Sequence, residues 1–357
     1  MAKSGFFTVE KRRGRWRLIA PDGAPFFSLG MNHIDSAGLR HPENIRLWQE
    51  RYGNSHERWI RQAVAPDLRD WGFNTIGWAQ EVVVRGPAMT RHSRNWTFEE
   101  YQWADMPYCH LLPFAEMHQW ECETRHPDFF SPEFADWCDY VARDQCARMA
   151  DDPKLIGYFY VDCPAWVHAP KPQFKGPLFD PGLLQTPAGR ERLFELAGRY
   201  YEVTRQAVRR YDPNHLILGD RYEGKAPLPD EVLRAAAPHV DALSVQYFAK
   251  PEQIIPDFQR WHDLTGLPVL LADACAPGRT PGAASKEHIE AYAPMLRALR
   301  ELPCCVGWHY CGAYIMNRCR KAGFRRESGE ADEALAAAFR QANRETAQWV
   351  AQTASEA

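Results

Sequence analysis

The sequence predicts an α/β protein built as a closed (β/α)8 barrel, preceded by a β-hairpin. Short apolar runs recur along the 357 residues, and most are followed by a longer segment with helical periodicity. We count eight such runs, and eight strand–helix units are the number that forms a closed (β/α)8 barrel. The first turn, SLGMNH at residues 28–33, lacks the G-x-G-x-x-G motif typical of an open doubly wound sheet. No internal repeat or low-complexity linker marks a second unit, so we expect one catalytic domain over residues 1–357.

The first predicted element is a hairpin at residues 6–19. Two β-like runs, residues 6–10 and 15–19, flank a short polar segment, and Pro21-Asp22-Gly23 turns the chain afterwards. We expect this hairpin to lie against the N-terminal mouth of the barrel. The barrel strands themselves are continuous apolar runs, which suits strands buried on both faces of a parallel sheet. We expect them at residues 26–31, 73–78, 109–115, 156–161, 216–220, 242–246, 269–273 and 305–309.

Helix start signals separate several of these strands. Ser131-Pro132-Glu133 and Thr186-Pro187 each offer an N-cap residue followed by Pro at the first helical position, and Ser285 precedes a third helical segment. The second of these helices is expected to end near Arg210, and a closing helix is expected over residues 330–350. The side chains expected on the inward faces are Phe134, Trp137, Val141 and Met149 in the first helix, and Leu193, Ala197, Tyr200 and Thr204 in the second.

The composition narrows the class of protein. The formal net charge is −3 and no basic patch interrupts the sequence, which argues against a nucleic-acid partner. We find no apolar run after the first residues and no 18-residue apolar stretch, so neither a signal peptide nor a membrane span is expected. We therefore expect a cytoplasmic protein whose ten Cys are free thiols, since no C-x-x-C pair suggests zinc. The oligomeric state stays open.

Polar and aromatic residues follow nearly every predicted strand. Catalytic residues of α/β barrels lie at these C-terminal strand ends, and aromatic rings pack well against the C–H faces of sugars. A purely structural barrel would have no reason to place so many carboxylates, amides and rings there. The residues at or near strand ends are Asn32, His33, Trp78, Glu81, Glu116, Asp162, Trp166, Arg221, Glu223, Gln246, Tyr247, Asp273, Trp308, His309 and Tyr310.

Longer segments point to a family. Residues 7–18, FTVEKRRGRWRL, lead into DGAPFFSLGMN at residues 22–32; the eighth strand reads VGWHY at residues 306–310 and is followed by residues 323–335. Together with residues 157–166 and 268–273, these segments resemble the agarase-like glycoside hydrolases of clan A over most of the chain. The resemblance implies a (β/α)8 barrel that acts on a carbohydrate. Without a secretion signal, we expect small oligosaccharides or glycosides as substrates.

The two catalytic glutamates of that clan are missing from the matching positions. The clan carries Asn-Glu at the end of strand four, where the Glu is the general acid/base, and a nucleophilic Glu at the end of strand seven. An ungapped match from Gly157 to Trp166 places Asp162 at the Asn and Cys163 at the Glu, and strand seven ends in Asp273. The resemblance therefore transfers the fold better than the mechanism.

Three interpretations of the chemistry are open. In the first, Asp162 and Asp273 are the working pair. Asp is one methylene shorter than Glu, so a retaining gap of about 5–5.5 Å could widen towards the roughly 6.5–9.5 Å that admits a water and gives inversion. In the second, Glu116, Glu81 or Glu223 supplies the proton. In the third, the barrel only binds sugar or catalyses a different reaction.

We predict a glycoside hydrolase that needs no metal or cofactor. Asp273 is expected to act as base or nucleophile, held ionised by Arg221, while burial beside Tyr160 or Trp166 keeps Asp162 protonated. Each candidate also has a structural alternative, since an Asp can cap a helix, a His can lie satisfied in the core and a Trp can close the barrel top. The sugar contacts are expected from Asn32, His33, Trp78, Glu116, Trp166, Arg221, Gln246, Tyr247, Trp308 and Tyr310.

Two rival functions remain. One is a metal-dependent barrel hydrolase or lyase, whose ligands would come from His33, Asp162, Asp273 and His309. The other is a sugar-binding barrel without catalytic activity. A metal scan separates the first rival, because the glycosidase reaction needs no metal, and a search for turnover separates the second.

Overall fold

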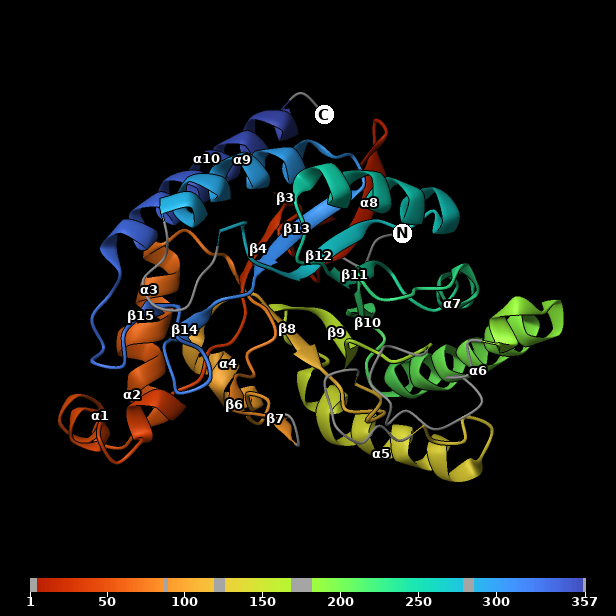
Figure 1. Cartoon of the computed structure of the whole chain (residues 1–357), viewed down its shortest axis with the longest axis horizontal. Helices are drawn as coiled ribbons and strands as arrows, with labels where there is room; N and C mark the ends of the chain where they lie inside the picture. The colour runs from red at the N-terminus through yellow and green to blue at the C-terminus, as the bar shows by residue number, and fades with distance from the viewer. Residues whose placement is uncertain (1–4, 87–88, 119–125, 168–181, 279–285, 356–357) are drawn as a thin grey trace.

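The predicted barrel is confirmed. The computed structural model of the protein describes residues 5–86, 89–118, 126–167, 182–278 and 286–355. Within these residues, eight strands form a closed barrel in the order β4–β5–β8–β9–β10–β11–β12–β13, and all neighbours pair in parallel (Figure 1). Each overlaps one predicted strand. Their bounds are β4 Ser28–Met31, β5 Thr75–Ile76, β8 Tyr108–Leu111, β9 Leu155–Asp162, β10 Leu216–Glu223, β11 Leu243–Gln246, β12 Val269–Ala274 and β13 Cys305–Tyr310.

The predicted hairpin is also present. Strands β1 (Thr8–Arg12) and β2 (Arg15–Ile19) pair antiparallel, and β3 (Pro25–Phe26) pairs with β2 to make a three-stranded sheet. Phe7 and Leu18 belong to the buried apolar cluster that includes barrel residues of β9, β10 and β12. The N–H of Trp16 donates to the carbonyl of Pro303, just before β13 begins, at 2.8 Å. Because these contacts lie at the N-terminal ends of the strands, the hairpin closes that end of the barrel.

The outer layer consists of helices that follow the strands (Figure 1). Ser131 and Thr186 cap their helices as predicted, because each side chain accepts a hydrogen bond from the backbone N–H three residues ahead. Ser285 lies outside the described residues. The helix bounds are α1 Ile45–Tyr52, α2 His56–Trp59, α3 Ala65–Asp70, α4 Phe98–Ala104, α5 Pro132–Met149, α6 Pro187–Tyr211, α7 Asp230–Ala236, α8 Pro251–Thr265, α9 Lys286–Glu301 and α10 Glu333–Ser355, with short turns at Ala37–Arg40, Ile60–Val64 and Leu183–Gln185.

The residues predicted on the inward faces of α5 and α6 are confirmed with one exception. All seven other predicted side chains are buried, but Trp137 is 44% exposed. Its indole donates to the carbonyl of Pro113 and stacks against Tyr140 on the outer surface. The prediction for Trp137 was wrong because the residue lies at the edge of the apolar stripe, where a large ring can turn outward.

Two short insertions lie on the C-terminal side of the barrel. Strands β6 (Val82–Arg85) and β7 (Thr90–His92) form an antiparallel hairpin after β5, and β14 (Ala313–Ile315) pairs with β15 (Gly323–Arg325) after β13. Both insertions contribute residues to the cavity described below. The nine cysteines in the described residues are free thiols, as predicted. In that same part of the chain, no helix combines the length and apolar character of a membrane span.

Candidate active site

A cavity of about 720 Å³ lies over the C-terminal ends of the barrel strands, within the size range of clefts that hold small molecules. It is lined by residues from the strand ends and from the two insertions. Five residues predicted for the site line it, namely His33, Trp78, Asp162, Gln246 and Asp273. The other lining residues include Cys163, Cys275, Cys311, Cys319, Arg85, His92, Arg320 and Lys321. Side chains predicted from several different strand ends thus surround one cavity.

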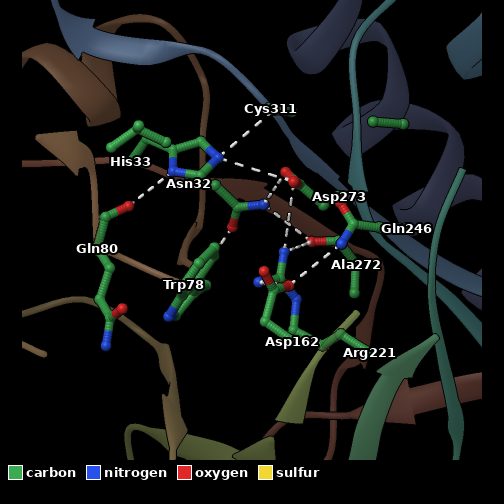
Figure 2. Close-up of polar contacts among 12 residues, drawn as sticks. Asn32, His33, Trp78, Gln80, Asp162, Arg221, Gln246, Ala272, Asp273 and Cys311 are labelled. Carbon is green, nitrogen blue, oxygen red and sulfur yellow. Dashed lines mark hydrogen bonds and ion pairs between the residues drawn. The ribbon is translucent and has the colours of Figure 1, made fainter. Parts of the chain in front are cut away.

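Asp273, from β12, is a buried carboxylate held by several donors (Figure 2). The side-chain amide of Asn32 donates to one carboxylate oxygen at 2.5 Å and to the carbonyl of Ala272 at 2.9 Å. His33 Nε2 lies 3.7 Å from the other oxygen. Burial alone would raise the pKa of Asp273, but the hydrogen bond and charge of His33, the charge of Arg221 and the Asn32 amide together hold that pKa well below its usual range. Asp273 is therefore ionised at neutral pH.

Arg221, from β10, lies between the two aspartates (Figure 2). Its guanidinium is 2.9 Å from a carboxylate oxygen of Asp162 and 3.7 Å from Asp273, and it donates to the carbonyl of Ala272 at 3.0 Å. The side chain is fully buried and lies over the rings of Trp78 and Phe159, 4.7 and 5.4 Å from their centroids. One cation thus bridges both carboxylates, as expected for Asp273, although its shorter contact is with Asp162.

His33 connects the strand ends to the insertions. Its Nδ1 donates to the carbonyl of Gln80 at 2.6 Å, and its Nε2 lies 3.4 Å from Cys311 Sγ and 2.9 Å from a guanidinium nitrogen of Arg320. Burial and the Arg320 charge lower the pKa of His33, but Cys311 and Asp273 outweigh them and raise it to about 9. Nδ1 therefore carries a proton, while Nε2 faces Arg320, Cys311 and Asp273.

Arg320 and Glu81 form a buried ion pair on the same side of the cavity. Arg320 Nε is 2.5 Å from a carboxylate oxygen of Glu81, which also accepts from the N–H of Val82 at 2.7 Å. Glu81 is thus engaged structurally, which weakens its candidacy as a proton donor. Nothing in the local sequence predicted Arg320, since it lies in the loop between β14 and β15.

Two lining residues have a strained backbone. His33 and Cys163 have φ values of 60° and 48°, a left-handed conformation that is unusual for residues with a side chain. Cys163 directly follows β9, and His33 lies two residues after the end of β4. Backbone strain of this kind costs about 1–3 kcal/mol and clusters at functional sites. Cys163 is the residue that the sequence resemblance aligned with the clan's acid/base Glu.

Five predicted sugar contacts lie elsewhere. Trp166 is buried and donates to Asp220 beside α6, and Glu116 is exposed outside the cavity. Tyr247 donates its hydroxyl to Asp257 of α8 at 2.6 Å. Trp308 donates to the carbonyl of Ala274 at 3.0 Å and packs on Tyr292 of α9. The Tyr310 hydroxyl contacts His288 of the same helix at 2.7 Å. None of these five residues therefore lines the described cavity, where the sequence analysis had expected them: Glu116, Trp166, Tyr247, Trp308 and Tyr310.

The alternation of side chains along a strand explains much of this difference. His309 faces the barrel interior, where it contacts Ser28 and Phe159, while its neighbours Trp308 and Tyr310 face the helices. In β10 the same alternation sends Arg221 inward and Asp220 outward. A strand end read from sequence gives the correct edge of the sheet, but a shift of one residue exchanges the two faces.

A substitution of Trp166 tests its reassignment. We expect Trp166→Phe to lower the free energy of unfolding by about 1–3 kcal/mol, because Asp220 loses a buried donor. The KM for substrate should stay unchanged. Urea denaturation and steady-state kinetics measure both quantities, and a rise in KM without loss of stability would return Trp166 to the site.

The environment of Asp162 differs from the one expected. Tyr160 packs on Phe114 and Tyr200, and Trp166 donates to Asp220, while Asp162 itself is only 3% exposed. Instead Asp162 is paired with Arg221, and Gln246 Nε2 lies 3.3 Å from the same oxygen. An adjacent cation favours the ionised carboxylate, which is a poor proton donor.

Glu223, at the end of β10, has the environment of an acid. Its pKa is raised to about 7, mainly by burial. A hydrogen bond from the N–H of Lys225 lowers this pKa, and the negative charges of Asp162 and Asp273 raise it by smaller amounts. Glu223 also acts on Cys163: burial raises the pKa of that thiol well above its usual value, and the charges of Asp162 and Glu223 raise it further. Glu223 is not among the residues that line the cavity, but it pairs across the sheet with Gln246, whose side-chain amide contacts Cys163.

Of the ligands named for the metal-dependent rival, His33 and Asp273 lie side by side, whereas His309 lies apart from them. His309 lies deep in the barrel, where its Nε2 is 2.8 Å from Ser28 Oγ, and burial lowers its pKa to about 3. Among the described residues, the group whose ligand atoms approach within 4.8 Å of one another is His33, Asp273 and Cys311. The Arg320 guanidinium contacts both His33 and Cys311 and already supplies a positive charge there. A bound metal would have to displace it.

Comparison with known proteins shows similarity at the level of fold. Neither a protein-family profile nor a curated protein matches the sequence. Among solved structures, the agarase AgWH50C is 18% identical with a TM-score of 0.70, covering 96% of this chain and 64% of that one. An exo-beta-agarase is 17% identical, with a TM-score of 0.75 and coverage of 96% and 66%. A beta-glucuronidase from an uncultured Clostridium is 14% identical, with a TM-score of 0.52 and coverage of 95% and 53%.

The chain thus spans less than two thirds of the length of these three structures. At these identities the likeness shows a shared barrel fold. It agrees with the fold implied by the sequence resemblance, and it leaves the catalytic residues to be argued from the site.

Proposed function

We propose that the chain is a glycoside hydrolase that acts on a small oligosaccharide or glycoside. The observation that carries the proposal is the convergence of Asp162 and Asp273, from β9 and β12, on one buried guanidinium beneath the cavity. Strands four and seven are the two that carry the catalytic carboxylates in the resembling clan. Glycosidases need two carboxyl groups with different protonation states, and the site offers an ionised Asp273 and a protonatable Glu223.

Asp273 is proposed to act on the anomeric carbon. Its ionised carboxylate would accept a proton from a water that attacks this carbon, or attack directly if the sugar lies close enough. His33, Arg221 and Asn32 stabilise the ionised form and fix its orientation. Because Asp273 is one methylene shorter than the clan's nucleophilic Glu, it leaves more room for a water beside the anomeric carbon, and water attack with inversion is the expected course.

The proton donor is proposed to be Glu223. The sequence analysis gave Asp162 as the first candidate for the proton donor. Asp162 does line the cavity, but its ion pair with Arg221 opposes protonation. A general acid works best with a pKa near the working pH, and burial gives Glu223 a pKa of about 7. In this assignment Asp162 fixes Arg221 and, through it, the position of Asp273.

The pH dependence of turnover decides between the two donors. The donor must be protonated, so kcat/KM is expected to fall as the pH rises through about 7. Glu223→Gln should remove this limb and lower turnover by at least about a hundredfold. If Asp162→Asn removes the limb instead, while Glu223→Gln keeps near-normal activity, the donor is Asp162 as the sequence predicted.

A further inference from the structure

We propose that the substrate carries an anionic group, a carboxylate or sulfate on the sugar, which Arg85 and Lys321 bind at the rim of the cavity. This proposal rests on the proposed function, because it concerns the substrate of the same site. It adds the chemical class of the substrate, which neither the carboxylates nor the fold specifies.

Arg85 and Lys321 are exposed side chains that line the cavity. Neither has an ion-pair or hydrogen-bond partner among the described residues, in contrast to Arg320 with Glu81 or Arg325 with Asp67. Arg85 ends β6, and Thr90 and His92 of the paired strand β7 also line the cavity. The hairpin therefore holds the Arg85 side of the rim in a defined position.

The buried charges beneath the rim do not neutralise these two cations. Arg221, Arg320 and protonated His33 face Asp162, Asp273 and Glu81, so the floor is close to balanced. The Cys311 thiol would add at most one negative charge when it ionises. The side of the cavity that carries Arg85 and Lys321 therefore has a net positive charge.

The order of the strands places these cations opposite the proposed proton donor. Arg85 follows β5 and Lys321 follows β13, and these two strands are the neighbours of β4 in the barrel. Counted around the ring of eight strands, β4 lies opposite β10, which carries Glu223. A sugar with its glycosidic oxygen near Glu223 would extend its far end towards β4. The anionic group is thus expected on the part of the ring distant from the anomeric carbon.

Direct binding measurements test this inference separately from catalysis. Methyl glucuronide, methyl galacturonide and methyl galactoside 6-sulfate are titrated calorimetrically into the Asp273→Asn protein, beside the neutral methyl glucoside and galactoside. At least one anionic sugar is expected to bind more than about tenfold tighter than its neutral counterpart, as one charge-assisted contact provides. The uronide and sulfate arms show which anion is preferred.

Arg85→Gln and Lys321→Gln should each remove much of this preference and leave the affinity for neutral sugars unchanged. Arg91→Gln is the matched control. It removes the same charge from the same hairpin, but Arg91 does not line the cavity. Equal or tighter binding of the neutral sugars, binding of no sugar at all, or an equal loss in Arg91→Gln would overturn the inference. If an anionic sugar binds but the wild-type protein hydrolyses no glycoside, only the proposed function fails.

Discussion

Replacing Asp273 by Asn is expected to leave the barrel folded and to lower turnover by at least about a hundredfold, the lower range for loss of a general base or nucleophile. Asn has nearly the same shape as Asp, and the Asn32 amide and Ala272 carbonyl remain in place. What disappears is the negative charge at the anomeric carbon, which His33, Arg221 and Asn32 all stabilise. Steady-state kinetics and circular dichroism on the same preparations measure the two parts of this prediction.

The matched control is Asp263→Asn, an exposed Asp on α8 remote from the cavity, which should leave turnover unchanged. An Asp273→Asn protein that keeps more than about a tenth of the wild-type rate would show that this carboxylate does not carry the reaction. An unfolded variant would be informative too, if Asp273→Glu restores the fold, because the charge would then serve stability.

The largest effect on stability is expected for Arg221→Met. Removing this guanidinium leaves Asp162 and Asp273 buried without the cation between them. Loss of one partner from a buried ion pair costs about 3–5 kcal/mol, because the remaining charge is uncompensated. We therefore expect the free energy of unfolding to fall by about this amount in urea denaturation at neutral pH.

Two comparisons make this result specific. Arg318→Met removes an exposed Arg that is paired with Glu43, and this change should reduce stability far less. Adding Asp162→Asn to Arg221→Met should recover part of the loss, because one of the stranded charges is then neutral. A loss as small as that of Arg318→Met would contradict the role given to Arg221.

The fold was largely predictable from sequence. Parallel strands buried on both faces are nearly continuous apolar runs, so all eight could be found, from residues 26–31 to residues 305–309. Ser131 and Thr186 fixed two helix starts because an N-cap side chain and a following Pro act locally. The boundaries of the short strand β5 and the outward turn of Trp137 depend on tertiary packing, which no local pattern encodes.

The site was predictable only in part. The residues that reach the cavity from strand ends, such as His33 and Asp273, follow from the topology of a barrel. Trp308 and Tyr310 were misplaced because sequence does not fix which face a strand-end residue takes. Arg85, Arg320 and Lys321 were missed because they belong to insertions whose return to the cavity is a long-range feature. The raised pKa of Glu223 depends on burial and neighbouring charges, which only the structure supplies.

The central claim is that this barrel hydrolyses glycosidic bonds with Asp273 at the anomeric carbon. The most direct test is time-resolved proton NMR of wild-type protein and Asp273→Asn with a panel of neutral and anionic aryl glycosides. We expect the wild-type protein to release a sugar whose first anomeric signal has the inverted configuration, and the variant to release little. Retained configuration would contradict the inverting course alone, whereas equal release by both proteins would remove Asp273 from the mechanism. Sugar binding without any new anomeric signal would show a carbohydrate-binding barrel and contradict the account.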